Sequence, residues 1–153
     1  KFSEKENTSS GRRGTIPTFQ RVENPTLLAQ RVTQWITARN KDSAKALSAI
    51  ICRWPKQAVQ LVEELRKLGF NSVRLGHREK FDFSPGITVT NVHQVKGLEF
   101  RNVLIVEPSE DNYKSGSEEE QNLLYVAVTR AEERLDFMGM QKPSSLLPPL
   151  SRP

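Results

Sequence analysis

Two short and almost uninterrupted apolar runs constrain the fold of this chain most strongly. Residues 46–52 (ALSAIIC) and 103–106 (VLIV) have the length of strands and contain few polar side chains. A strand with one wet face alternates apolar and polar residues, whereas a central parallel strand is covered on both faces and is apolar throughout. The two runs therefore predict an α/β fold, a parallel β-sheet with helices on both faces.

Helical patterns between further strands agree with this prediction. Asn24 and Pro25 supply a cap and a first turn for a helix that ends near Arg39, and Pro55 opens a second helix that Gly69 stops. Ser117 and Glu120 form an expected capping box for a third helix, ending near residue 133. Further strands are predicted at 15–22, 70–75, 87–91 and 135–138.

Length and composition indicate one domain. The 153 residues suit a single core, which we expect over residues 15–140, with a flexible linker or tail at 1–14 and a flexible C-terminal tail at 141–153. No apolar run approaches the roughly 20 residues that cross a bilayer, so we expect no membrane partner. One cysteine and no apolar leader predict a cytoplasmic location, and the absence of an initial Met suggests part of a longer polypeptide.

Charge is unevenly distributed along the chain. Residues 1–101 contain 18 Lys and Arg against 9 Asp and Glu, whereas residues 102–153 contain 5 against 9. A basic first part fits a polyanion such as nucleic acid, although many basic proteins never bind one. Charge alone therefore favours a nucleic-acid partner only slightly.

The most informative segment is the polar loop at 91–100 (NVHQVKGLEF) between two predicted strands. His93 and Lys96 could contact phosphates, Gly97 permits close approach of the backbone, and Glu99 could accept hydrogen bonds from a ribose. A solvated turn with a capping glutamate explains the same residues. The residues alone leave both interpretations open.

A second segment, 123–131 (LLYVAVTRA), is predicted to lie on the last helix. Its apolar residues form one face, and Arg130 falls at the edge of that face near the end of the helix. An arginine in this position can extend along apolar surface or pair with a carboxylate, and it can also project as a bidentate phosphate ligand. Spacing alone does not choose between these roles.

Together the two segments resemble motifs of the C-terminal RecA-like motor domain of superfamily 1 helicases of the UvrD/Rep type. NVHQVKGLEF is similar to motif V, usually T-x-H-x-x-K-G-x-E-F, and LLYVAVTRAEERL is similar to motif VI. The resemblance implies a single RecA-like domain. It also implies that Arg130 is the catalytic arginine finger at the γ-phosphate of ATP, and that Gly97 and Glu99 contact the nucleotide.

The resemblance also implies a single-stranded DNA track. His93 matches a residue that contacts the strand, and Lys96 is carried over with it. Asn91 stands where many relatives have threonine, and Arg53, at the end of an apolar run, is a weaker candidate. These four residues are the expected nucleic-acid ligands, and none is expected to bind a metal.

The cofactor implied by the resemblance is ATP with Mg²⁺, but the chain has no G-x-x-x-x-G-K-[ST] segment. An N-terminal RecA-like domain of the same polypeptide would supply the phosphate cradle and most of the metal ligands, and this fragment alone should be inactive. The leading hypothesis is an ATP-dependent DNA helicase or translocase. Alternatives are a helicase-like ATPase that remodels a protein complex such as RNA polymerase, and a degenerate interaction module. RNA polymerase and repair proteins are the candidate protein partners.

Overall fold

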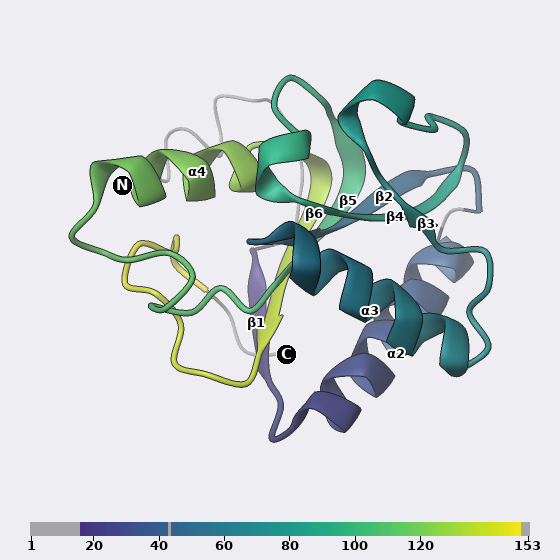
Figure 1. Cartoon of the computed structure of the whole chain (residues 1–153), viewed down its shortest axis with the longest axis horizontal. Coiled ribbons are helices and arrows are strands. Elements are labelled where there is room, and N and C mark those ends of the chain that lie inside the picture. The colour runs from purple at the N-terminus through teal and green to yellow at the C-terminus, as the bar shows by residue number, and fades with distance from the viewer. Residues whose placement is uncertain (1–15, 43, 151–153) are drawn as a thin grey trace.

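One parallel sheet forms the centre of the molecule (Figure 1). The computed structural model describes residues 16–42 and 44–150, and within them the strand order is β1-β6-β5-β2-β4-β3, with every pair parallel. The strands are β1 (Thr18–Arg21), β2 (Leu47–Cys52), β3 (Arg74–Leu75), β4 (Gly86–Asn91), β5 (Phe100–Val106) and β6 (Ala131–Gly139). The helices are α2 (Pro25–Asp42), α3 (Pro55–Lys67) and α4 (Glu118–Val128), with short 3₁₀ turns η1 (Arg78–Lys80) and η2 (Val92–Gln94). The predicted α/β class is confirmed.

The apolar runs lie at the centre of the sheet, as predicted. Ile50 of β2 and Leu104 of β5 face a core shared with α2 and α3, whereas their neighbours Ile51 and Ile105 face a second core shared with α4. Successive side chains of a strand point to opposite faces, so a strand buried on both sides has to be apolar at every position. Helices therefore cover both faces of the sheet.

The first two helices follow their sequence signals. Asn24 Oδ1 accepts a hydrogen bond from Leu27 N at 2.9 Å, which caps α2. The expected stripe of this helix is buried and comprises Leu28, Val32, Trp35 and Ile36. Helix α3 stops where Gly69 adopts φ of +94°, and Phe70 N donates to Leu65 O at 3.0 Å across the turn.

That turn also shortens the strand predicted at 70–75, because only Arg74 and Leu75 pair with β4.

The third helix is shorter than predicted, and the strand after it is longer. Helix α4 ends at Val128, where Thr129 Oγ1 donates to Tyr125 O at 2.9 Å and to Val126 O at 3.1 Å. Strand β6 begins at Ala131 and pairs with β5 from Phe100 onward. Pairing with neighbouring strands on both sides outweighs the helical pattern of this segment. Arg130 therefore lies in the turn between α4 and β6, not on the helix.

Residues 141–150, which were predicted to begin a flexible tail, contact the body of the domain. Ser144 is buried, its hydroxyl donates to Tyr113 O at 2.7 Å, and its backbone N donates to Pro108 O at 2.8 Å. Leu146, Leu147 and Leu150 pack against the core on the α4 face. The predicted linker at 1–14 lies outside the described residues, as do residues 151–153.

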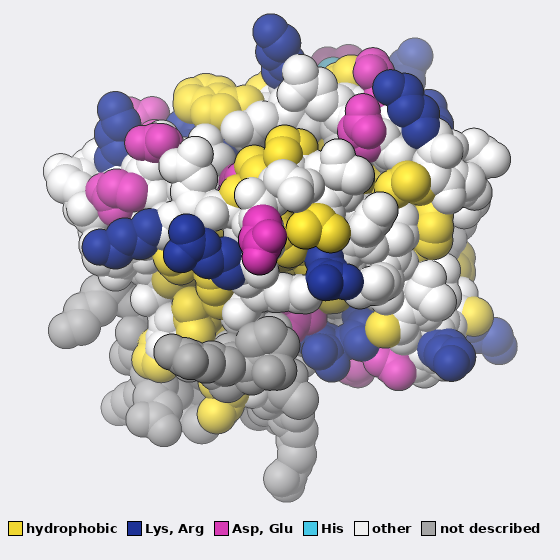
Figure 2. All heavy atoms as spheres, turned by 90° about the horizontal axis from the view of Figure 1, so that it is seen from below, with side chains coloured by type: hydrophobic (Ala, Val, Ile, Leu, Met, Phe, Trp, Pro, Cys, Tyr) yellow, Lys and Arg dark blue, Asp and Glu magenta, His cyan; other side chains and the backbone are white. Residues whose placement is uncertain are grey.

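The surface seen in Figure 2 carries charges of both signs. Lys and Arg side chains are interspersed there with Asp and Glu, and hydrophobic side chains gather between them. A continuous basic stripe, the usual footprint of a nucleic-acid groove, is not visible on this face. Binding of nucleic acid to this face would therefore depend on individual side chains and not on a continuous basic stripe.

Within the described ranges, no helix is long and apolar enough to span a bilayer.

Candidate functional site

The predicted site residues lie at two opposite edges of the sheet. Because all the strands are parallel, all of them end at one edge. Arg53 directly follows β2 and His93 follows β4, which places both at the carboxyl edge. Glu99 directly precedes β5 and Arg130 directly precedes β6, which places both at the amino edge. Open parallel sheets usually bind ligands at the carboxyl edge. That expectation therefore holds for Arg53 and His93 but not for Glu99 and Arg130.

Residues 92–99 connect the two edges. Val92 and Val95 are buried in the core on the α4 face, and η2 packs beside α4. The predicted DNA-contacting and nucleotide-contacting residues therefore lie at the two ends of one short crossing segment.

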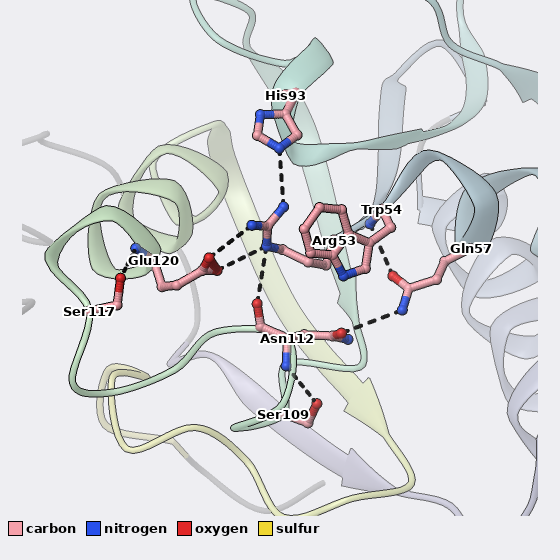
Figure 3. A network of polar contacts seen from close by, with 8 residues as sticks. All are labelled: Arg53, Trp54, Gln57, His93, Ser109, Asn112, Ser117 and Glu120. Carbon is pink, nitrogen blue, oxygen red and sulfur yellow. Dashed lines mark hydrogen bonds and ion pairs between the residues drawn. The ribbon is translucent and has the colours of Figure 1, made fainter.

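Arg53 is the centre of a polar network at the carboxyl edge (Figure 3). Its guanidinium pairs with Glu120 through Nε to Oε1 at 3.0 Å and Nη2 to Oε2 at 2.9 Å. Nε also donates to Asn112 O at 3.1 Å, and Nη1 lies 3.1 Å from His93 Nε2. Arg53 is only 3% exposed. In this structure it binds other residues of the protein, and a direct contact of Arg53 with DNA stays a prediction.

Glu120 is a residue of this site that sequence reasoning missed. Ser117 Oγ accepts from Glu120 N at 3.2 Å, so half of the predicted capping box is confirmed. The carboxylate of Glu120 does not complete that box, because it pairs with Arg53. The two partners are 67 positions apart, and no local pattern in the sequence links them.

His93 is held so that one ring nitrogen faces the network. A guanidinium can only donate, so the short contact with Arg53 makes His93 Nε2 the acceptor and leaves the proton on Nδ1. Figure 3 shows this second nitrogen directed away from Arg53. The side chain of His93 is exposed at the surface. It can therefore donate a hydrogen bond to a ligand at the carboxyl edge.

Asn91 caps the turn that follows β4. Its Oδ1 accepts a hydrogen bond from His93 N at 3.0 Å and caps η2, and the residue is 5% exposed. Asn91 therefore positions the backbone of His93 and does not face solvent.

Trp54 is a second residue of this site that was not among the predicted ligands. Trp54 is the N-cap residue that precedes α3, and Gln57 Oε1 accepts a hydrogen bond from Trp54 N at 3.0 Å. The indole, however, is 46% exposed and lies over the guanidinium of Arg53, with 3.8 Å between the Arg53 Cζ atom and the ring centroid. The His93 ring lies nearby, with 6.5 Å between the two ring centroids.

At the amino edge, Arg130 binds backbone carbonyls. Its Nε donates to Val126 O at 2.9 Å and its Nη1 donates to Leu98 O at 3.2 Å, while Nη2 donates to Thr129 Oγ1 at 3.1 Å. The residue is half-buried. The contact with Leu98 joins the two segments that the sequence analysis singled out, 91–100 and 123–131. Three of the five guanidinium N–H groups are used in these bonds, which leaves two for an external acceptor.

The turn before β5 has the geometry that its glycine predicts. Gly97 has φ of +82°, a conformation that other residues rarely adopt, and the space around it is open. Lys96 and Glu99 on either side of it are exposed. Glu99 is therefore a free-standing carboxylate close in sequence to the Leu98 carbonyl that Arg130 binds.

A groove of about 670 Å³ lies on the opposite face of the sheet, between α2 and α3. Cys52, Gln57 and Glu107 are among the residues that line it, and it contains none of the predicted ligands. Burial raises the pKa of the Cys52 thiol to about 12, and nearby Glu107 adds to this effect. Cys52 is therefore a core residue and not a nucleophile at neutral pH. Within the described residues, no group of three or more His, Cys, Asp or Glu is placed to hold a metal ion.

One segment of the chain matches a known protein family, and the fold is similar to that of a solved structure. Residues 86–137 match the family model of the UvrD-like helicase C-terminal domain, a range that contains both His93 and Arg130. The fold is similar to that of the C-terminal domain of a possible DNA helicase from Lactobacillus plantarum WCFS1, with a TM-score of 0.76 and 24% sequence identity, over 94% of this chain and 89% of that chain. The resemblance stated from the two motifs is thus confirmed for the matched segment, and the RecA-like architecture for the fold.

Proposed function

We propose that this chain is the second motor domain of an ATP-dependent superfamily 1 DNA helicase or translocase. The observation that carries the proposal is the contact between Arg130 and Leu98 O, because it joins the two motif-bearing segments within the range that matches the helicase family model. An N-terminal RecA-like domain of the same polypeptide would complete the ATP site and supply the phosphate cradle and most Mg²⁺ ligands.

The amino edge fits a nucleotide. Arg130 has two N–H groups beyond its three internal bonds, Gly97 leaves the adjoining turn open, and Glu99 offers an exposed carboxylate. A charged donor held in a fixed position stabilises the negative charge that develops on a transferring phosphoryl group. In this proposal Arg130 is the catalytic residue, and Glu99 and Gly97 bind the nucleotide sugar.

The carboxyl edge fits a single strand of DNA. His93 presents an N–H donor at this edge, and Lys96, exposed further along the crossing segment beside Gly97, is a second proposed contact. Residues 92–99 contact Arg53 at one end and Arg130 at the other. A change in the hydrogen bonds of Arg130 during an ATP cycle would therefore be transmitted along this segment to His93.

The substitution Arg130→Ala in the intact protein tests the catalytic role. We expect ATP turnover to fall about a thousandfold or more, as for other arginine fingers. Arg66→Ala is the matched control, because Arg66 also donates to a backbone carbonyl, Val73 O, but lies on α3 on the other face. Thermal melts of both variants separate lost chemistry from lost stability. Turnover that is equal in the two variants would refute the assignment of Arg130.

Stimulation of ATP turnover by single-stranded DNA tests the DNA track. We expect stimulation of the intact wild-type protein, reduced by His93→Ala. Turnover that ignores DNA but responds to a protein such as RNA polymerase would replace the helicase proposal with a remodelling function.

A further inference from the structure

We propose that Trp54 is a stacking platform for one base of the bound single strand. This inference deepens the proposed function, since it rests on single-stranded nucleic acid passing over the carboxyl edge. It assigns a ligand contact to a residue outside the segment that matches the family model, which begins at residue 86.

The exposure of Trp54 is the first observation. Tryptophan is highly buried on average, and the other tryptophan of this chain, Trp35, is only 8% exposed. Trp54 is 46% exposed, and Arg53 covers one face of its ring at 3.8 Å. The exposed area therefore belongs to the opposite face and to the ring edge. Figure 3 shows the indole between Arg53 and Gln57, beside His93.

The rigidity of the platform is the second observation. Glu120, Asn112 and His93 all hold the guanidinium that lies under the ring. Gln57 fixes the Trp54 backbone and also reaches Asn112 Oδ1 at 3.4 Å. A ring that is already immobile loses little conformational entropy when a ligand stacks on it. The network is therefore a support that makes stacking more favourable.

Charge selects the kind of ligand. Arg53 already makes a cation–π contact with one face of the ring, and by drawing the π electrons toward that face it weakens a second such contact, with a lysine or arginine of a peptide, on the open face. A neutral base carries no such penalty, and its flanking phosphates are attracted by exposed Lys56 and by the His93 donor. Stacking on a tryptophan face tolerates every base, so we expect little sequence preference at this position.

The test compares two single strands of the same length, about 10 nucleotides, on the 153-residue chain. One is oligothymidylate, and the other has the same sugar-phosphate backbone without bases. We expect the wild-type chain to prefer the first strand, and Trp54→Leu to reduce that preference about tenfold. Trp54→Phe should keep most of it. The ratio of the two affinities is the readout, because a general loss of structure or charge weakens both strands alike.

Phe83→Leu provides a matched control. Phe83 is 62% exposed in the loop before β4, so the substitution removes an exposed aromatic ring from another place. The ratio of the affinities of Phe83→Leu for the two strands should equal that of the wild type. A Trp54→Leu chain that keeps the wild-type preference overturns the stacking proposal and leaves the proposed function intact. A wild-type chain that binds neither strand contradicts DNA binding itself, and the stacking proposal with it.

Discussion

At the scale of single residues, the carboxyl edge depends on one buried charge pair. Arg53 and Glu120 have side chains that are 4% and 17% exposed, whereas Lys67 and Glu64 on α3 form a similar pair at 72% and 56% exposed. Removing one partner of a buried pair leaves an uncompensated charge, but an exposed charge is stabilised by water. The two glutamates therefore form a matched test.

We expect Glu120→Gln to lower the free energy of unfolding by about 3–5 kcal/mol. Glu64→Gln should change it by less than about 0.5 kcal/mol. Urea unfolding of both variants, followed by circular dichroism, measures the difference. Equal stabilities would mean that Arg53 finds other partners when Glu120 is lost.

The same pair marks the limit of sequence reasoning. Arg53 and His93 were each predicted as site residues, but the contact between them and their common dependence on Glu120 follow from the order of the strands and not from any local pattern. Trp54 was not among the predicted ligands, and the position of its ring over the guanidinium of Arg53 follows from the fold and not from a local pattern. Residue types could be predicted, whereas their pairings required the fold.

At the scale of elements, sequence patterns predicted the strands correctly where burial of apolar side chains dominates the local structure. The apolar runs at 46–52 and 103–106 became central strands because only apolar residues fit between two cores. The helix predicted to reach residue 133 ended at Val128 because its last residues pair with β5. The element carrying Arg130 was therefore misassigned, although its role as a candidate ligand was unaffected.

Two glycines with positive φ allow the effect of a substitution on stability to be compared with its effect on function. Gly97 precedes β5 with φ of +82°, and Gly69 ends α3 with φ of +94°; an added Cβ would meet nothing within 4 Å at either position. Replacing either glycine by alanine should therefore cost only backbone strain, about 1–2 kcal/mol.

We expect Gly97→Ala and Gly69→Ala to lose similar stability in thermal melts. Only Gly97→Ala should also weaken ATP turnover of the intact protein, since Gly97 lies in the proposed nucleotide turn. A Gly97→Ala variant that turns over ATP as fast as Gly69→Ala would remove this turn from the nucleotide site.

At the scale of the whole molecule, residues 141–150 connect the end of the chain to the carboxyl edge. Ser144 binds the backbone of Pro108 and Tyr113, within the same loop that supplies Asn112 O to Arg53. Within this loop, Asn112 Nδ2 donates a hydrogen bond to Glu107 O at 2.8 Å. The C-terminal segment thus supports the network under Trp54 without contacting it directly.

Truncation after Met140 should therefore affect both stability and the site. Loss of the three partly buried leucines at 146, 147 and 150 and of the Ser144 bonds should lower the free energy of unfolding by about 3 kcal/mol or more. Because the 107–117 loop loses its support, the preference for oligothymidylate over the abasic strand should also fall. Leu68→Ala, which removes an exposed side chain at the far end of α3, is the control and should change neither quantity appreciably. A truncated chain that is less stable but keeps the full preference would show that the loop holds Arg53 in place without the C-terminal segment.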